Sequence, residues 1–518
     1  MIKKHACYLS LALLAAPLVA LADEVPVDPA TLMQVALTQL PQTCPALAPR
    51  VDPSKLSLLQ TFYQHQSYQP VWSVAGRLAS LIAQLPSLAD EGLDPSFYLL
   101  PNEEGVCADI ETSLTYLQAL HDLHFGRLEQ SRYEPIWHSD EVLSDKQAEL
   151  LAIAEPGLQD VANAFEQARP TFELYQDLRR AYARERLQTL ASWQPLSSGQ
   201  LLKPGMQDSR VPVLAQRLLS GGYLNSLPKI TSNTYNAELV SAVKSFQLDH
   251  SLQADGVIGP GTIEELNVSP QMRRDQMRIN LERFRWMARD FESTSLLVNV
   301  PAALLIVYQD GQPVWQTRTQ VGKASRQTPL LKSQVTRLTL NPTWTIPPTI
   351  FREDKLPHIR RDPSYVSRNG LQVLDSSGRV LSADEVNWDR PGNILLRQGA
   401  GPRNPLGKIV IRFPNPFAVY LHDTPSQALF SKAPRAFSSG CVRVESVFEL
   451  RDWLVSPAEK TRTEQLLSTG RTHEFRLDQP MPILLTYWTA QADKDGKVSF
   501  APDIYNHDER LIKALASQ

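Results

Sequence analysis

Two neighbouring stretches, VYLHDTP at residues 419–425 and SSGCVRV at residues 438–444, decide how the C-terminal half of this chain is interpreted. In the first, a short run of strand-forming residues places His422 where the strand gives way to a loop. In the second, Cys441 directly follows Gly440. The two side chains can meet only if the chain folds back, which a strand, a loop and a tight turn permit. The stretches therefore predict a β-rich domain that holds a Cys–His pair.

The chemistry expected of this pair is nucleophilic catalysis by a thiolate. A free thiol has a pKa of about 8.5, and a neighbouring imidazole lowers that pKa and holds the thiolate. Gly440 lets the backbone turn tightly, which leaves the amides of Gly440 and Cys441 free to face a developing oxyanion. Ser446 and Glu449 have the spacing of a capping box, so a helix is expected to follow.

The N-terminus predicts export from the cytoplasm. Lys3 and Lys4 give a positive start, an apolar stretch follows, and Ala20-Leu21-Ala22 matches a small-x-small cleavage site. The apolar stretch is shorter than the roughly 20 residues that a membrane span needs. We therefore expect residues 1–22 to be a cleaved signal peptide, with a retained anchor as the alternative. Since no later stretch is long and apolar enough to span a bilayer, no stable membrane span is expected after cleavage.

Export gives meaning to the cysteines that remain, which are Cys44, Cys107 and Cys441. An oxidising compartment tends to pair thiols, and an odd count leaves one unpaired. Cys44 and Cys107 both lie in loop-like surroundings in the N-terminal third. They are predicted to form a disulfide, which leaves Cys441 free; three buried, unpaired cysteines are the alternative.

Length and composition predict several folded domains. At about 100–200 residues per domain, 518 residues suggest about three units, and 42% hydrophobic with 21% charged residues indicates a folded protein. A net charge of −3 gives no electrostatic reason to expect nucleic acid as a partner. Because His358, His422 and His507 are scattered and no phosphate-binding glycine loop is visible, neither a metal nor a cofactor is expected.

The pattern of apolar residues divides the chain into regions. Helical spacing dominates the first part, and strand-like runs with a turn at Asp310-Gly311 mark the last part. The expected regions are a helical scaffold at 28–200, a small unit at 203–268, a linker helix at 271–291 and a β-rich domain at 295–505, which is interrupted by a Pro- and Arg-rich insertion at 350–389.

The unit at 203–268 resembles the small three-helix peptidoglycan-binding module of many wall enzymes. The matching pieces are LAQRL at 214–218, VKSFQ at 243–247 and the turn DGVIGPGT at 255–262. The resemblance implies binding to the bacterial wall, and a helical spacer that binds nothing is the alternative.

The C-terminal stretches are similar to the signature of the L,D-transpeptidases, which has a His, a loop and then Ser-x-Gly-Cys-x-Arg. These positions fall on His422, Ser438, Gly440, Cys441 and Arg443. Most members have a second His before the Gly, where this chain has Ser439, so His422 is the sole base candidate in the motif. NPTWTIP at 341–347 and GPRNPLG at 401–407 also match blocks of the family.

The resemblance covers nearly the whole mature chain and points to the large periplasmic branch of the family. That branch implies a multidomain α+β fold, with a helical N-terminal scaffold, a three-helix peptidoglycan-binding module and a β-rich catalytic domain whose inserted flap covers the active site. It also implies a periplasmic location and acylation by carbapenems. The implied partners are peptidoglycan stem peptides, with wall synthases as further candidates.

The reaction implied by the resemblance is a crosslinking acyl transfer. The thiolate of Cys441 attacks the carbonyl of the third-position diamino acid of a donor stem tetrapeptide, D-alanine leaves, and the side-chain amine of a second stem accepts the acyl group. His422 would act as base or hold an ion pair. The remaining assignments are an oxyanion hole from Gly440, Cys441 and Ser439, a loop-fixing, carboxylate-binding or salt-bridging role for Arg443, and pocket walls or core for Tyr420 and Trp344.

Other functions remain open at this point. One is a catalytically inert, wall-binding structural protein. Two others use the same chemistry, namely an L,D-carboxypeptidase and an enzyme that attaches lipoproteins to the wall. A cysteine peptidoglycan hydrolase is disfavoured, because those enzymes usually have the Cys before the His in the chain.

Overall fold

The computed structural model describes residues 1, 28–137, 143–190, 194–228 and 233–517. The expected signal peptide at 1–22 lies outside these residues, apart from Met1. The chain forms two compact units, one of residues 1–74 and 100–114 and the other of residues 75–99 and 115–518. None of the helices in the described ranges combines the length and the apolar character that a membrane span requires.

The first unit is helical, as expected. Asp52 caps its main helix by accepting hydrogen bonds from the amides of Ser54 and Lys55. Tyr63 is fully buried, and its hydroxyl donates to Asp109 at 2.6 Å. The elements are α1 (Pro29–Thr38), α2 (Leu40–Thr43), η1 (Ala48–Arg50), α3 (Pro53–His65) and the first half of α5 (Val106–Phe125).

A disulfide joins Cys44 to Cys107, with the two Cα atoms 5.6 Å apart. Among the described residues Cys441 is the free cysteine. The predicted pairing is therefore confirmed, and the reactive candidate is the thiol left over.

Replacing both Cys44 and Cys107 by serine is expected to destabilise the first unit. The bond closes a sequence separation of 63 residues, and losing a disulfide of this kind costs about 2–4 kcal/mol because the unfolded chain gains freedom. Urea denaturation of the full chain, followed by circular dichroism, measures the effect. Carbapenem labelling of Cys441 is the control for an intact second unit; an unchanged unfolding midpoint would contradict the prediction.

The second unit begins with further helices. The carboxylate of Glu91 is fully buried and accepts hydrogen bonds from Arg169 at 2.6 Å, Arg179 at 2.5 Å and Tyr175 at 2.6 Å, so three side chains converge on one acid. The elements are α4 (Arg77–Gln84), η2 (Leu85–Glu91), η3 (Pro95–Phe97), the second half of α5, α6 (Gln130–Tyr133), α7 (Leu143–Gly157), α8 (Val161–Ala168) and α9 (Glu173–Glu185).

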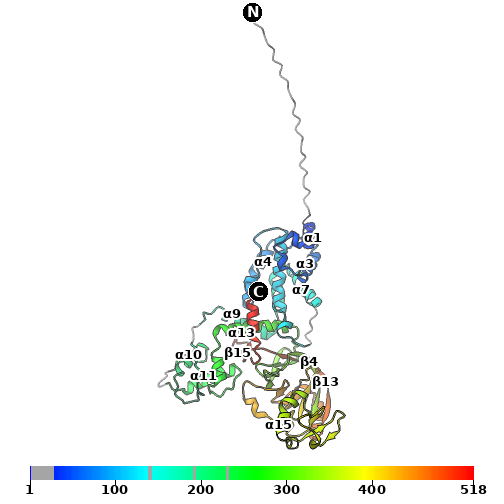
Figure 1. Cartoon of the computed structure of the whole chain (residues 1–518). Helices are drawn as coiled ribbons and strands as arrows, with labels where there is room; N and C mark the ends of the chain where they lie inside the picture. The colour runs from blue at the N-terminus through cyan, green and yellow to red at the C-terminus, as the bar shows by residue number, and fades with distance from the viewer. Residues whose placement is uncertain (2–27, 138–142, 191–193, 229–232, 518) are drawn as a thin grey trace. The chain divides into compact units, whose positions relative to one another are not determined.

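Three helices then form a group of their own around Leu214, Leu239 and Val243 (Figure 1). They are α10 (Val211–Ser220), α11 (Ala237–Asp249) and α12 (Pro260–Leu266). Asn236 caps α11 through the amide of Leu239, and Gly221 ends α10.

The long helix α13 (Pro270–Met287) buries charge as well as apolar surface. Arg283 is 1% exposed and lies 2.6 Å from Glu134 and 2.7 Å from Asp508, the first residue of α19 (Asp508–Ala516). Glu282 pairs with Arg285 at 2.5 Å. Buried charges need such partners, since each would otherwise lose its hydration without compensation.

The catalytic candidate residues lie on a nine-stranded sheet of order β11-β3-β12-β10-β9-β4-β13-β1-β2, which the additional pairing of β2 with β3 closes. Its apolar interior is formed by inward side chains of nearly all the strands. The strands are β1 (Ser295–Asn299), β2 (Leu304–Gln309), β3 (Gln312–Gly322), β4 (Leu331–Leu340), β9 (Ile409–Arg412), β10 (Leu421–His422), β11 (Ala436–Ser438), β12 (Val442–Val444) and β13 (His473–Thr486).

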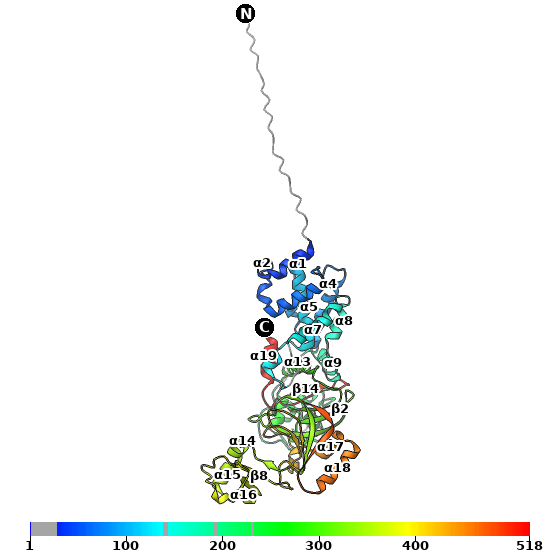
Figure 2. The same cartoon turned by 90° about the vertical axis from the view of Figure 1, so that its right-hand side faces the viewer.

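The insertion has a sheet and a core of its own, and Figure 2 shows α14, α15, α16 and β8 gathered in one lobe. Its sheet has the order β5-β8-β6-β7, so it takes in residues on both sides of the expected range 350–389. The elements are β5 (Trp344–Thr345), α14 (Pro348–Ile350), the π-helix η4 (Phe351–Lys355), α15 (Leu356–Arg361), α16 (Tyr365–Arg368), β6 (Leu371–Leu374), β7 (Val380–Leu381), η5 (Ala383–Glu385) and β8 (Leu395–Gln398).

The remaining elements pack around the closed sheet. Ser456 and Glu459 form a capping box at the start of α18. The elements are η6 (Gln427–Ser431), α17 (Val447–Leu454), α18 (Pro457–Ser468), and the hairpin of β14 (Ala490–Ala492) and β15 (Val498–Phe500).

Candidate active site

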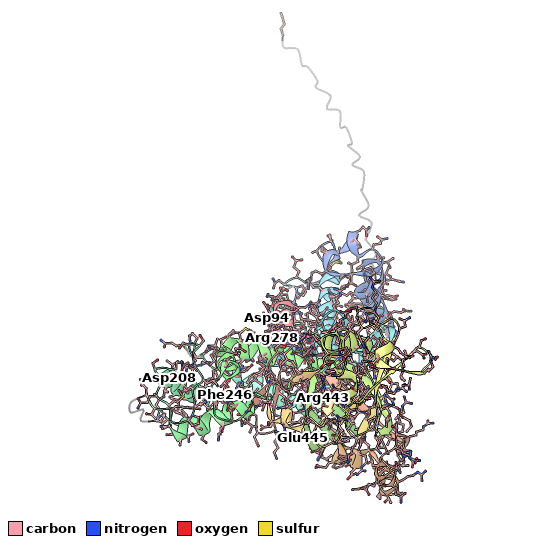
Figure 3. All side chains as sticks on the ribbon, turned by 60° about the horizontal axis from the view of Figure 1, so that its bottom comes forward. Asp94, Asp208, Phe246, Arg278, Arg443 and Glu445 are labelled. Carbon is pink, nitrogen blue, oxygen red and sulfur yellow. A yellow bond between two sulfur atoms is a disulfide. The ribbon has the colours of Figure 1, made fainter. Side chains whose placement is uncertain are left out.

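The register of β10 and β12 places the motif residues on one face of the sheet. The two strands are parallel, with Leu421 opposite Val442 and His422 opposite Arg443. Leu421 and Val442 belong to the interior core, so their sequence neighbours face the other way. Cys441 stands at the entry to β12 beside Tyr420, where the amide of Val442 donates to the carbonyl of Tyr420 at 3.1 Å. Figure 3 labels Arg443 on this strand.

A backbone carbonyl orients the imidazole of His422. Its Nδ1 lies 2.5 Å from the carbonyl oxygen of Asp423. Since a carbonyl only accepts, Nδ1 carries the proton and Nε2 keeps its lone pair. Burial and then the charge of Arg443 lower the pKa of His422 to about 3, against the opposing effect of the Asp423 carbonyl. The imidazole is therefore neutral at physiological pH.

Asp423 shapes the loop after His422. Its carboxylate accepts hydrogen bonds from the amide of Thr424 at 2.7 Å and from the amide of Lys408 at 2.8 Å. Gly407 has a φ of 61°, and a Cβ there would lie 2.2 Å from Asp423 Oδ2. The glycine of the 401–407 block thus lets two chain segments approach closely enough to fix the loop of His422.

The thiol of Cys441 is half-buried, and burial raises its pKa above the ordinary value. Hydrogen bonds from the backbone and the phenol of Tyr420, followed by the charges of Arg443 and Arg412, act in the opposite direction. The thiol also donates to the carbonyl of Ala418 at 3.9 Å. Within the described residues no hydrogen bond joins Cys441 to His422. The raised thiol pKa and the lowered imidazole pKa leave both groups neutral at rest.

Alkylation of Cys441 by iodoacetamide is expected to report this neutral pair. Because the thiol pKa is raised, the thiolate fraction is small at pH 7 and grows about tenfold per pH unit until the pKa is passed. The alkylation rate should therefore climb steadily from pH 6 to pH 9, as followed by mass spectrometry. A plateau from pH 5 to pH 8 would instead mean a preformed thiolate–imidazolium pair and would contradict the prediction.

The turn at Gly440 differs from the expectation that both neighbouring amides are free. The Gly440 amide donates to the hydroxyl of Ser438 at 3.1 Å, and this hydroxyl donates in turn to the carbonyl of Cys441. The carbonyl of Gly440 accepts from Thr328 at 2.9 Å. Among the described residues, the amide of Gly440 is therefore engaged by Ser438, whereas no hydrogen-bond acceptor is seen for the amides of the other expected oxyanion donors, Ser439 and Cys441. Ser438 therefore holds the turn at φ 112° for Gly440 and occupies its amide.

The structure also corrects the expected helix cap. The side chain of Ser446 makes no capping hydrogen bond, although the helix α17 does begin at Val447. The amide of Ser446 donates to Thr317 at 3.3 Å, and Glu449 accepts from Trp315 Nε1 at 3.2 Å. Both groups are therefore engaged by β3. The short strand β12 between Cys441 and this helix was missed, because three residues give too short an alternation to detect.

Arg443 bonds Gln320 at 3.0 Å and takes part in no ion pair among the described residues. The salt bridge considered as an alternative is therefore not seen. Its positive charge acts on both neighbours, since it lowers the pKa of His422 and that of Cys441.

Arg326, which the sequence did not single out, links Ser439 to the insertion. Its guanidinium donates to the Ser439 hydroxyl at 2.9 Å and to the carboxylate of Asp354 at 2.7 and 2.8 Å, and it also pairs with Glu353. Only its position between β3 and β4 would have drawn attention to it. The Ser439 hydroxyl thus accepts a hydrogen bond from Arg326. Ser439 stands at the position where the signature described above usually has a second His.

The two aromatic candidates lie in different places. Tyr420 is beside Cys441 and lines a cavity of about 760 Å³, while Trp344 packs partly buried against the core of the insertion. Burial raises the pKa of Tyr420, so its phenol keeps its proton as a hydrogen-bond donor. In the described part of the chain no group of three or more His, Cys, Asp or Glu side chains is placed to hold a metal ion.

Comparisons with known proteins agree with this architecture. Residues 293–469 match the L,D-transpeptidase catalytic domain, residues 57–181 a scaffold domain, and residues 207–266 a putative peptidoglycan binding domain. A putative L,D-transpeptidase of Haemophilus influenzae is 33% identical over 255 residues, which are 48% of this chain and 50% of that protein. A probable N-acetylmuramoyl-L-alanine amidase of Bacillus licheniformis is 42% identical over 74 residues, 14% of this chain and 20% of that protein.

The chain thus spans half the length of the first relative and a fifth of the second. An L,D-transpeptidase from Xylanimonas cellulosilytica, solved as a crystal structure, aligns over 56% of this chain and 98% of that chain, with 16% identity and a TM-score of 0.17.

Fold and matches together define a multidomain α+β protein. Its C-terminal half carries an L,D-transpeptidase catalytic domain, preceded by a peptidoglycan-binding domain and a scaffold domain. The resemblance noted from the motif and the expected fold class are therefore confirmed.

Proposed function

We propose that the protein is an exported L,D-transpeptidase that crosslinks third-position diamino acids of peptidoglycan stem peptides through an acyl-enzyme on Cys441. The observation that carries this proposal is the parallel pairing of β10 and β12, which sets Cys441, Tyr420 and His422 on one face of a domain of this family. The periplasm is the proposed location.

The proposed reaction uses a neutral starting pair. Nε2 of His422 accepts the thiol proton while Sγ of Cys441 bonds to the donor carbonyl. The lowered imidazole pKa and the raised thiol pKa both disfavour proton transfer before this bond forms. The amide of Cys441 and the phenol of Tyr420 would donate hydrogen bonds to the developing oxyanion. The imidazolium then returns the proton to the leaving amine of D-alanine.

The second half-reaction runs through the same groups. The side-chain amine of another stem attacks the thioester carbonyl, the C–S bond breaks, and the proton lost by the amine passes by way of His422 to the sulfur. The product is an amide between the two third residues, and Cys441 returns as a thiol. Arg443 is proposed to keep the imidazole neutral between the two halves.

Incubation of the full chain with a disaccharide-tetrapeptide tests the proposal. The expected products are D-alanine and crosslinked dimers, with a thioester on the peptide that contains Cys441, detected by peptide mapping. Dimers with no such adduct would overturn the mechanism. Release of D-alanine without dimers would make the protein a carboxypeptidase, and neither product nor a carbapenem adduct on Cys441 would leave a wall-binding structural protein.

A further inference from the structure

A row of side chains crosses the outer face of the closed sheet and starts at the nucleophile. Arg337 on β4 lies directly opposite Arg412 on β9 and directly opposite Arg476 on β13. Leu421 pairs with Ile411 on β9 and with Val442 on β12. One residue further along the same register, Tyr420 lies opposite Arg412 on one side and opposite Cys441 on the other. The row therefore consists of Arg412, Arg337 and Arg476 on the strands β9, β4 and β13, together with Tyr420 and Cys441, which directly precede β10 and β12.

The row forms one side of the cavity of about 760 Å³. All three arginines and Tyr420 line it, and Ala418, whose carbonyl oxygen lies 3.9 Å from the sulfur of Cys441, lines it as well. The cavity is therefore continuous with the surroundings of the thiol. Arg337 and Arg476 are exposed, so their guanidinium groups are accessible to a bound molecule.

The arginines of the row have no acidic partner within the described residues. Arg412 donates Nε to Thr339 at 2.7 Å, and its guanidinium lies 5.2 Å from the ring centre of Tyr420. Of the carboxylates in the described part of the chain, Glu474 alone lines the cavity, and it accepts from the Thr339 hydroxyl at 2.8 Å. Three cations therefore face one anion.

This arrangement is unfavourable for the protein without a ligand. Like charges directly opposite one another on neighbouring strands destabilise a sheet, and here two such pairs follow each other. Residues that weaken the fold without an evident structural gain are expected at binding sites, where a ligand compensates them.

We propose that Arg412, Arg337 and Arg476 are the binding track for the free carboxylates of the donor stem peptide, which lies extended across the strands from Cys441 outward. The proposal rests on the proposed function and adds the side chains that select an acidic donor. Guanidinium groups bind carboxylates through paired, planar hydrogen bonds, which lysine cannot reproduce.

The spacing of the row suits an extended peptide. Neighbouring strands lie about 4.8 Å apart, so the outer two arginines are about 10 Å apart, a distance that about three extended residues span at about 3.3 Å each. The donor is assigned rather than the acceptor because the row begins at Cys441, to whose sulfur the donor carbonyl must bond. The donor residues that precede this carbonyl then lie over the arginines.

Single-turnover acylation of Cys441 tests this track in the full chain. The variants are Arg337→Gln, Arg476→Gln and the double variant, with Arg462→Gln on α18, which does not line the cavity, as the matched control. Each variant is given the stem tetrapeptide, or the same peptide with every carboxylate except that of D-alanine converted to an amide. Thioester formation and D-alanine release are measured before any acceptor is added.

Each single variant is expected to lower kcat/KM for acylation by the acidic peptide about tenfold, the effect of losing one charged hydrogen bond. Acylation by the amidated peptide should not change, and the melting temperature should be equal to or above that of the wild type. Arg462→Gln should match the wild type with both peptides.

The other outcomes separate the two proposals. If the wild type is not acylated at Cys441, the proposed function fails. If the wild type is acylated and the variants equal it with the acidic peptide, the arginine track fails while the function stands. An equal loss with both peptides would show a structural role, and a loss limited to dimer formation would place the acceptor on the row; either result overturns the proposal.

Discussion

His422→Gln is expected to slow acylation of Cys441 by about a thousandfold, within the range of roughly 10²–10⁴ that a positioned general base contributes. Glutamine keeps a donor for the Asp423 carbonyl but has no basic nitrogen to replace Nε2. The thiol proton would then have no acceptor as the carbon–sulfur bond forms. Because burial raises the thiol pKa, a preformed thiolate cannot compensate for the loss at neutral pH.

The rate of D-alanine release in a single turnover measures this effect. His473→Gln on β13, outside the motif, is the matched control and should retain the wild-type rate. The wild-type rate should show no acid limb between pH 5 and pH 7, because the pKa of His422 is lowered to about 3 and its base form persists. An acid limb near pH 6.5, or a His422→Gln rate within tenfold of the wild type, would contradict the assignment.

Arg283→Met is expected to destabilise the second unit by about 3–5 kcal/mol, the typical cost of removing one partner from a buried ion pair. Methionine fills much of the volume of the arginine stem but leaves Glu134 and Asp508 without their shared guanidinium. Both carboxylates are at least nine-tenths buried, so their charges would be poorly compensated. The ion pair between α13 and Asp508 of α19 would be lost as well, which leaves the hydrogen bond from Gln276 of α13 at 3.4 Å.

Urea unfolding at several pH values distinguishes this cause from a packing defect. Without Arg283, burial would raise the pKa of the two carboxylates above their unfolded values, so the folded variant would bind extra protons as the pH falls. The stability gap to the wild type should therefore narrow from pH 7 to pH 5. A gap that is constant with pH would point to packing alone, and exposed Arg462→Met should show almost no gap.

The local patterns in the sequence predicted much of the fold. Helices such as α11 and α13 follow from apolar periodicity with a capping Asn or Ser, which act within a few residues. The disulfide followed from the odd number of cysteines after export. The family motif predicted that Cys441 and His422 act together before their positions in the sheet were known, because the motif specifies both residues.

The parts that could not be predicted depend on partners distant in the chain. Ser446 and Glu449 have the residue types of a capping box, but both are engaged by β3. The amide of Ser446 donates to Thr317, and the carboxylate of Glu449 accepts from Trp315. The amide of Gly440 looked free because nothing local showed that Ser438 would turn back onto it. The alignment of Arg412, Arg337 and Arg476 arises from the register of strands far apart in sequence, which no single segment encodes.

The guanidinium of Arg326 contacts both Asp354 in the insertion and Ser439 in the loop before Cys441. Any outward swing of η4 that parts Asp354 from Arg326 also changes the charge balance felt by the Ser439 hydroxyl, one glycine away from the sulfur. Asp354 and Glu353 are partly exposed, so dissolved salt weakens their hold. We therefore expect the ionic strength of the medium to influence the loop before Cys441 through a segment that contributes no residue to the catalytic motif.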